Sequence, residues 1–275
     1  MANAPYASTV LAKQPVGYWR LGERAGPTAT DASGFGLDGT YFGSPAFNQP
    51  GALITDEDTA VGLGGPASRD YVEIGDPLSA AFSQPTSRLG LTVEVWVRPD
   101  VLIFAGETRE RYIHWLGKCG PGQCEWGLRF YSQDSPSRPN RISAYIWNPA
   151  GGEGAGAFFQ DVLTPGEWIH VVAVYEPGDQ NTDPPAGVHI YRDGVHRCGP
   201  PSPGTLYRGF GISPAHGTMP LHLGTREAAV SGGAAVSYLT GALDEIAIYP
   251  RVLTADEILE NFIAARGNLT ARPAS

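Results

Sequence analysis

The last part of the chain combines a strand, an abrupt stop and one short helix, and this combination limits the possible folds. Residues alternate between two faces from Ala242 to Tyr249, as in a β-strand. Pro250 lacks the amide hydrogen that a sheet ladder needs, so the strand must end there. Thr254 and Glu257 then form a capping box, which predicts a helix whose apolar side packs on a sheet.

Asp244 is the exceptional residue of this segment. The alternation places it on the same face as Ile246 and Ile248. A carboxylate that is buried among isoleucines requires an ion pair, hydrogen bonds or a bound cation. We therefore expect Asp244 to make a specific polar interaction.

The rest of the chain predicts many short strands joined by turns. The 275 residues include 36 glycines and 24 prolines, and no repeat or low-complexity linker divides them. We predict an all-β, antiparallel two-sheet jelly-roll sandwich with one short C-terminal helix. Residues 1–275 then form a single domain, with a core at about 15–265, a lead-in at 1–14 and a short C-terminal tail. The predicted strands before the closing element are 15–23, 61–64, 71–74, 91–99, 112–118, 125–131, 141–148, 157–163, 168–176, 188–192, 195–197 and 221–227.

Charge and hydropathy argue against two classes of partner. The net charge is −9 and the chain has no basic run, which argues against nucleic acid. No stretch approaches the ~20 apolar residues of a membrane helix, so we expect no membrane insertion. The chain starts at methionine without a signal-peptide pattern. We expect an extracellular, cell-surface or virion location. The protein then leaves the cell by a route that needs no signal peptide, or the given sequence is part of a longer chain.

Three cysteines allow at most one internal disulfide. Cys119 and Cys124 flank a short Gly-Pro-Gly-Gln loop and are the candidate pair, while Cys198 is left over. Reduced thiols are equally consistent with the sequence.

Several phrases, taken in order, resemble one known family. They are YWRLGE (18–23), DASGFGLDGTY (31–41), TVEVWVRP (92–99), GEWIHVVAVYE (166–176), IYRDGV (190–195), LHLG (221–224) and GALDEIAIYPRVLTADEI (241–258). Together they resemble the LamG-like jelly-roll family, the laminin-G and concanavalin A-like lectin/glucanase sandwiches. This resemblance implies the fold but not one function, because the fold carries lectins, glycosidases, adhesion modules and virion parts.

The resemblance also implies a structural calcium ion, because family members often hold one between the glycine-rich N-terminal turn and the last strand. A hard cation takes six to eight oxygen ligands, which aspartates and turn carbonyls supply. Alternatively, the N-terminal aspartates cap turns and Asp244 accepts hydrogen bonds from loop amides. The matching positions here are Asp31, Gly36, Asp38, Gly39 and Asp244.

Two predicted strands carry a candidate carbohydrate surface. Sugar sites combine flat aromatic rings with fixed polar groups. If the polar faces of segments 125–131 and 141–148 coincide, they form such a surface; otherwise the aromatic residues are ordinary half-buried sheet residues. The candidate residues are Arg129, Tyr131, Arg141, Tyr145, Trp147 and Asn148.

No catalytic pattern is visible. Glycosidases on this sandwich use an E-x-D-x-E strand, which is absent, so we expect no enzyme and keep a glycoside hydrolase as a remote alternative. The first hypothesis is a non-catalytic carbohydrate-binding or adhesion module that recognises a surface glycan or polysaccharide. The second is a structural or receptor-binding virion protein, such as a phage tail or capsid-surface component, with other virion or surface proteins as partners.

Overall fold

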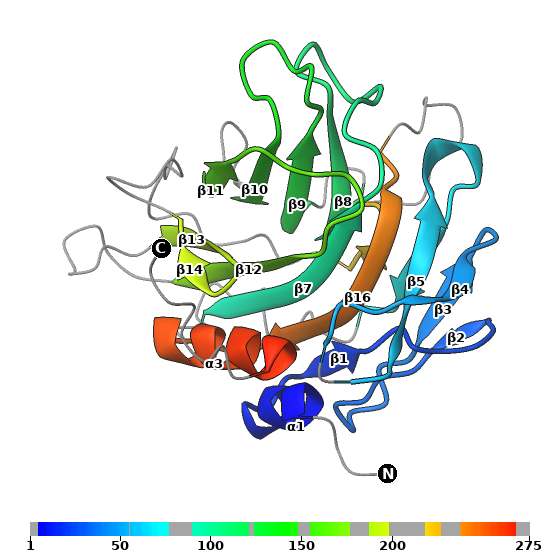
Figure 1. Cartoon of the computed structure of the whole chain (residues 1–275), viewed down its shortest axis with the longest axis vertical. Helices are drawn as coiled ribbons and strands as arrows, with labels where there is room; N and C mark the ends of the chain where they lie inside the picture. The colour runs from blue at the N-terminus through cyan, green and yellow to red at the C-terminus, as the bar shows by residue number, and fades with distance from the viewer. Residues whose placement is uncertain are drawn as a thin grey trace, which may run out of the picture.

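The computed structural model describes residues 5–54, 56–76, 90–120, 124–147, 155–176, 187–197, 218–226 and 237–267. Within these ranges the chain forms two eight-stranded sheets, and neighbouring strands in each sheet run antiparallel. The prediction of an antiparallel two-sheet sandwich is therefore confirmed (Figure 1).

Sheet A contains the closing strand that the sequence predicted. Seven of its strands form one row, and β1 pairs with the closing strand outside that row. Its strands in spatial order are β14 (Val195–His196), β13 (Gly187–Arg192), β12 (Ile169–Glu176), β7 (Leu91–Pro99), β16 (Thr240–Tyr249), β5 (Thr59–Gly64) and β4 (Ala46–Pro50), with β1 (Gly17–Trp19) on β16.

Sheet B contains the strands that carry the candidate sugar surface. Its strands in spatial order are β11 (Ala155–Gln160), β10 (Arg141–Ile146), β9 (Trp126–Tyr131), β8 (Tyr112–Lys118), β15 (Leu221–Leu223), β6 (Tyr71–Ile74), β3 (Gly39–Phe42) and β2 (Thr28–Ala29).

The main core lies between the two sheets. From β7, Val93, Val95 and Val97 face this interior, whereas Glu94 and Trp96 face the opposite side of sheet A. From sheet B, alternate residues such as Leu128 complete the core. The period of two in the sequence thus predicted which residues of β7 and β9 share a face.

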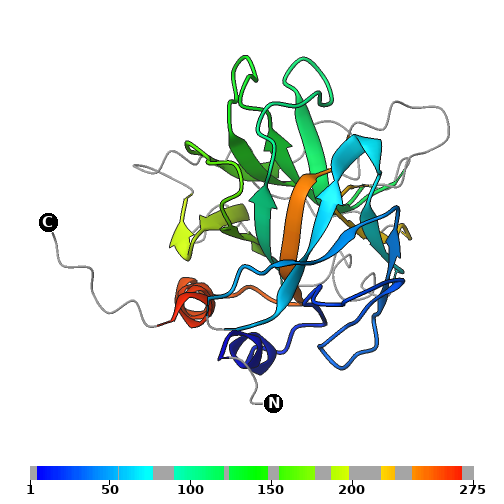
Figure 2. The same cartoon turned by 45° about the vertical axis from the view of Figure 1, so that its right-hand side comes forward.

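The outer side of sheet A is covered by two helices, α1 (Pro5–Ala12) and α3 (Ala255–Arg266). Figures 1 and 2 both show the helices side by side. The capping box predicted for α3 is present. The predicted C-terminal helix is therefore confirmed, and α1 is a further helix within residues 1–14, which were predicted as a lead-in. An eight-residue helix is unstable alone, and Tyr6 and Val10, both fully buried, hold α1 on the sheet.

Glu94 connects both helices to sheet A. Its carboxylate is fully buried and accepts hydrogen bonds from Tyr6 of α1 (2.9 Å) and Asn261 of α3 (2.8 Å). It also accepts one from Tyr249 of β16 (2.7 Å) and lies 2.8 Å from Nε2 of His170 on β12. Burial opposes ionisation, but the hydrogen bonds from His170, Tyr249 and Asn261 lower the pKa of Glu94 below its ordinary value. The carboxylate therefore stays charged within the protein.

The alternation along β16 is interrupted, and this corrects the placement of Asp244. The register of β16 against β7 shifts between Asp244 and Ala247, and Glu245 has a positive φ of 53°. This bulge turns Ile246 and Ile248 into the main core, while Asp244 lies opposite Trp96 on the other face. Asp244 therefore does not share a face with the two isoleucines.

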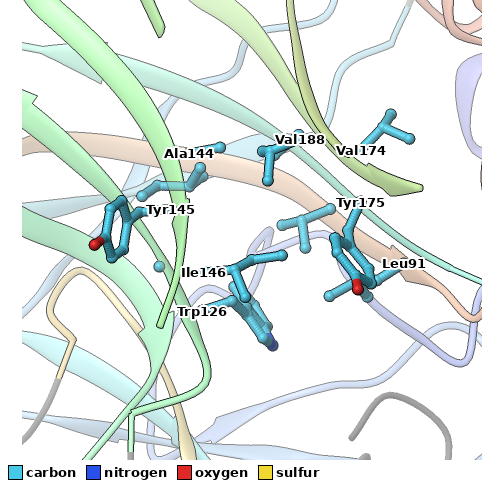
Figure 3. A pocket seen from close by; sticks show the side chains of 12 residues that line it. Leu91, Trp126, Ala144, Tyr145, Ile146, Val174, Tyr175 and Val188 are labelled. Carbon is cyan, nitrogen blue, oxygen red and sulfur yellow. The ribbon is translucent and has the colours of Figure 1, made fainter. Parts of the chain in front are cut away.

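A small apolar pocket opens between the sheets, with a volume of about 20 Å³ (Figure 3). Trp126, Ile146, Leu91 and Val188 are among its lining residues. Figure 3 shows Ile146 on the pocket side of β10 and the Tyr145 ring on the opposite side of the strand. This volume fits about one water molecule, so the pocket is too small to bind a sugar ring.

Candidate functional site

The outer face of sheet B carries a cluster of aromatic and cationic side chains that is centred on Arg129. Arg129 of β9 pairs directly with Ser143 of β10. Its guanidinium carbon lies 4.2 Å from the ring centroid of Tyr145, 5.0 Å from that of Tyr112 and 5.4 Å from that of Trp147. These distances are typical of cation–π contacts. The polar faces of β9 and β10 therefore coincide, as the sugar-surface hypothesis requires.

His114 of β8 holds the Arg129 side chain in position through a hydrogen bond. The His114 side chain is fully buried, and its Nε2 lies 2.9 Å from Nε of Arg129, which is always a donor. Its Nδ1 lies 3.0 Å from the Glu107 carboxylate and must therefore carry the proton. Burial, together with the nearby guanidiniums, lowers the pKa of His114 to about 4. The imidazole is therefore neutral at pH 7, and Arg129 keeps its acceptor.

Glu107 anchors this arrangement from the loop before β8. It accepts hydrogen bonds from His114 and from the hydroxyl of Ser237, and Ser237 also accepts from the His114 amide at 3.3 Å. Burial would raise the pKa of Glu107, but these hydrogen bonds and the guanidinium of Arg226 lower it to about 2. Segments near residues 107, 114 and 237 thus share one charged hydrogen-bond network.

Trp147 forms the aromatic floor of the cluster. Its ring lies 5.0 Å from Tyr145 at 79° and 5.5 Å from His114, measured between centroids. Arg226, which follows β15, places its guanidinium carbon 5.8 Å from the same indole. A Cβ atom on Gly127 would lie 3.4 Å from the indole, so this glycine lets the ring lie close to the strand. Tyr145 and Trp147 are both half-buried.

Two predicted contact residues have other roles. Tyr131 is 1% exposed, because Arg138 and Arg141 place their guanidiniums 5.6 and 5.8 Å from its ring. Tyr131 therefore supports the surface from beneath and is not open to a ligand. Arg141 lies 3.7 Å from the Phe158 ring and donates to Gln160, next to the cluster on β11. Asn148 lies outside the described residues.

The sequence did not reveal several members of the cluster. Tyr112 and His114 are two residues apart on β8, which pairs with β9. Their alternation is the sequence signal that could have placed both side chains on the face of Arg129. Arg226 and Glu107 had no such signal, because their proximity depends on long-range pairing of β8 with β15 and on the loop before β8.

The predicted calcium residues form two separate hydrogen-bonded groups. The Asp31 carboxylate accepts from the amides of Tyr18, Ser33 and Leu37 and from the Ser33 hydroxyl. The Asp31 amide in turn donates to Asp38 at 2.8 Å. A cation at Asp31 would have to displace these donors. Nearby, Gly36 adopts a positive φ of 74° and Gly39 begins β3.

Asp244 accepts a hydrogen bond from the Ala52 amide at 2.7 Å, while its second oxygen is buried without a hydrogen-bond partner. Burial, together with nearby carboxylates, raises the pKa of Asp244 well above its ordinary value. Within the described ranges no three His, Cys, Asp or Glu side chains gather as a metal site. Because these contacts do not test backbone-ligated calcium, the calcium ion stays a prediction.

The cysteine pair lies in the loop that follows the end of β8. Cys119 and Cys124 are joined as a disulfide in the structure, and Cys119 is buried. Cys198 lies outside the described residues.

A family model for the concanavalin A-like lectin/glucanases superfamily matches residues 66–259. This match covers more than half of the 275 residues. The chain belongs to this superfamily. The resemblance drawn from its motifs is therefore confirmed. No curated protein matches the sequence.

Solved structures of similar fold include neurotoxin structures. One is botulinum neurotoxin type C, whose cell entry depends on interaction with two ganglioside molecules (9% identity, TM-score 0.64, 94% of this chain and 53% of that chain). Two others are the binding domain of botulinum neurotoxin DC in complex with SialylT (10%, TM-score 0.63, 94% and 53%) and with rat synaptotagmin II (10%, TM-score 0.62, 94% and 53%). Identities this low show a shared fold alone, and this chain spans about half of each neurotoxin chain.

In the part of the chain that the structure describes, no helix is long and apolar enough to cross a membrane.

Proposed function

We propose that this superfamily domain is a non-catalytic carbohydrate-binding module, and that it binds a surface glycan on the outer face of sheet B. The observation that carries this proposal is the half-buried Tyr145–Trp147 pair beside a guanidinium that His114 holds in place. Aromatic faces suit the C–H surface of a sugar ring, and fixed donors suit its hydroxyl oxygens.

The two sheets differ in a way that favours this face. The outer side of sheet A is covered by α1 and α3, whose residues form a second apolar cluster with it. The described residues place no helix on the outer side of sheet B. Polar and aromatic residues occupy that side across several strands, from Phe158 on β11 to the stacked pair of Tyr71 and Phe42. A ligand surface of this extent suits an oligosaccharide.

The related structures are consistent with this proposal. The neurotoxin domains of the same fold interact with ganglioside molecules or SialylT, and one of them binds rat synaptotagmin II. A glycan is therefore our first candidate ligand. We place the protein outside the cell or on a virion surface, where such ligands are presented.

A glycan array followed by calorimetry with the strongest ligand tests the function. Trp147→Ala should weaken binding at least about tenfold, because it removes the aromatic floor. Trp168→Ala is the matched control: Trp168 is also half-buried and lies near a guanidinium, that of Arg98 at 5.4 Å, but it packs beside the helices on sheet A. It should bind within about twofold of the unchanged protein. The absence of binding to every glycan, or equal binding by Trp147→Ala, would refute the proposal.

A further inference from the structure

We propose that Lys118 and Asp76 condense to an isopeptide bond, an amide between their side chains, and that Glu125 carries the protons that this reaction moves. The proposal concerns the end of sheet B where β8 stops and β9 begins, and it does not depend on the glycan surface.

Three segments of sheet B meet at this site. Leu221 of β15 pairs with Ile74 of β6 on one side and with Lys118, the last residue of β8, on the other. Asp76 follows the end of β6, and its side chain reaches Lys118. Glu125 immediately precedes β9, and its amide donates to the Lys118 carbonyl at 3.0 Å. The fold therefore brings two carboxylates from separate segments to one amine.

Lys118 occupies an unusual place for a lysine. The chain contains two lysines, and the side chain of this one is fully buried, which is rare unless the charge is paired. On β9 its register partner is Trp126, a member of the main core. Apolar surroundings penalise charge, so moving a proton from an ammonium to a carboxylate in contact with it costs less there than in water.

The two carboxylates contact the Lys118 amine in different ways. Glu125, which is also fully buried, accepts a hydrogen bond from Nζ, an arrangement that suits proton exchange. Oδ1 of Asp76 lies 2.9 Å from Nζ, yet this buried oxygen makes no hydrogen bond within the described residues. The Asp76 carboxyl group thus lies beside the nitrogen without accepting its proton. Its side chain is 20% exposed, which lets a released water molecule leave.

The bond forms by loss of water. Glu125 takes one proton from the Lys118 ammonium, and the resulting amine attacks Cγ of Asp76. Glu125 passes that proton to one oxygen of Asp76, then takes a second proton from the nitrogen and passes it to the same oxygen. The new Cγ–Nζ bond replaces one Cγ–O bond, water leaves, and Glu125 ends as a carboxylate. Nothing is oxidised or reduced.

The surroundings favour the condensed product. Well-oriented groups within one molecule react with effective molarities on the order of 10⁵–10⁸ M. The reaction also replaces a buried ammonium and a carboxylate by a neutral amide, which removes a desolvation penalty. The disulfide between Cys119 and Cys124 closes the loop from Lys118 to Glu125, so it holds the amine next to its proton acceptor.

Mass spectrometry of the full chain, denatured after incubation of the folded protein and with its cysteines reduced and alkylated, tests the proposal. We expect a mass that is lower than that of the sequence by one water molecule. Trypsin should then cleave after Lys13 but not after Lys118. The tryptic peptide 70–88 should be recovered joined to peptide 112–129.

Three variants test the assigned roles. Glu125→Gln cannot carry protons, and Asp76→Ala has no carboxyl group to condense, so both should keep the full mass of their sequences. Lys13→Arg is the matched control, because Lys13 forms an ion pair with Glu260 at 2.7 Å on the helix side of the molecule. It should still lose one water molecule.

The measurement on the unchanged protein decides whether the bond exists, because it does not depend on the folding of any variant. Full mass together with cleavage after Lys118 would overturn the proposal and leave a buried ion pair. Loss of water within peptide 112–129 alone would place the bond at Glu125 and overturn the choice of Asp76. Loss of water in Glu125→Gln would overturn the role of Glu125 as proton carrier.

Discussion

Glu94→Gln tests the physical account of how the helices are held on sheet A. The substitution keeps the shape of the side chain but replaces one carboxylate oxygen by an NH₂ group, which cannot accept. The carboxylate serves four neighbours, two at each oxygen: Tyr6 and His170 at Oε1, and Tyr249 and Asn261 at Oε2. Two of these four groups therefore lose their acceptor and remain buried.

The magnitude follows from this count. A hydrogen bond to a charged group contributes about 1.5–3 kcal/mol, so two lost bonds amount to roughly 3–6 kcal/mol. Removing a buried charge offsets part of this loss, because its desolvation penalty also disappears. We expect Glu94→Gln to lower the free energy of unfolding by about 2–4 kcal/mol, a large fraction of the ~5–15 kcal/mol typical of a domain.

Urea unfolding followed by circular dichroism and tryptophan fluorescence measures this change. Glu167→Gln, at an exposed turn, is the control and should stay within about 0.5 kcal/mol of the unchanged protein. Tyr249→Phe combined with Glu94→Gln should cost less than the sum of the two single changes, because the residues share a hydrogen bond. The reasoning is refuted if Glu94→Gln is as stable as the control, or if the double change is additive.

The same residue predicts a dependence on pH. The folded-state pKa of Glu94 is below its ordinary value of 4.5, so its stabilisation is present above pH 4.5 and is lost as the pH falls through the folded-state pKa. The stability difference between the unchanged protein and Glu94→Gln should therefore shrink in acid.

Three further expectations concern other parts of the molecule. The pKa of His114 falls from 6.5 to about 4 on folding, so its contribution to stability should decline as the pH drops from 6.5 towards 4, and His114→Gln should flatten that part of the urea-measured profile. Calcium binding, implied by the family, predicts a lower melting temperature in EDTA and its recovery with added calcium; an unchanged midpoint would contradict it. The Cys119–Cys124 bond closes a short loop, a sequence separation of 5, so replacing both residues by serine should cost about 2 kcal/mol, and no loss would argue against the bond.

The fold was accessible from the sequence because its signals are local. The alternation of residues 91–99 separates Val95 from Trp96, and the structure has them on opposite faces of sheet A. Leu253 and Ile258, which flank the predicted capping box at the spacing of a hydrophobic staple, are both buried beneath the last helix. Such signals depend on neighbours within a few residues, so one sequence suffices to detect them.

Features that depend on distant partners were missed or misplaced. The helix at residues 5–12 has no acidic first turn or basic last turn, and it forms because Tyr6 reaches Glu94, 88 positions away. The bulge at Glu245 breaks the alternation on which the placement of Asp244 depended. Similarly, alternation grouped Tyr145 with Trp147 within one strand, but it could not show that Arg129 lies on the same face or that Arg138 and Arg141 cover Tyr131.

The indole N–H resonances of the six tryptophans test the location of the binding surface most directly. In a ¹H–¹⁵N titration with the strongest ligand from the glycan array, the Trp147 signal should shift progressively and saturate, while the Trp168 signal stays in place. A saturating shift of Trp168 with Trp147 unaffected would place the ligand away from the outer face of sheet B and contradict the account.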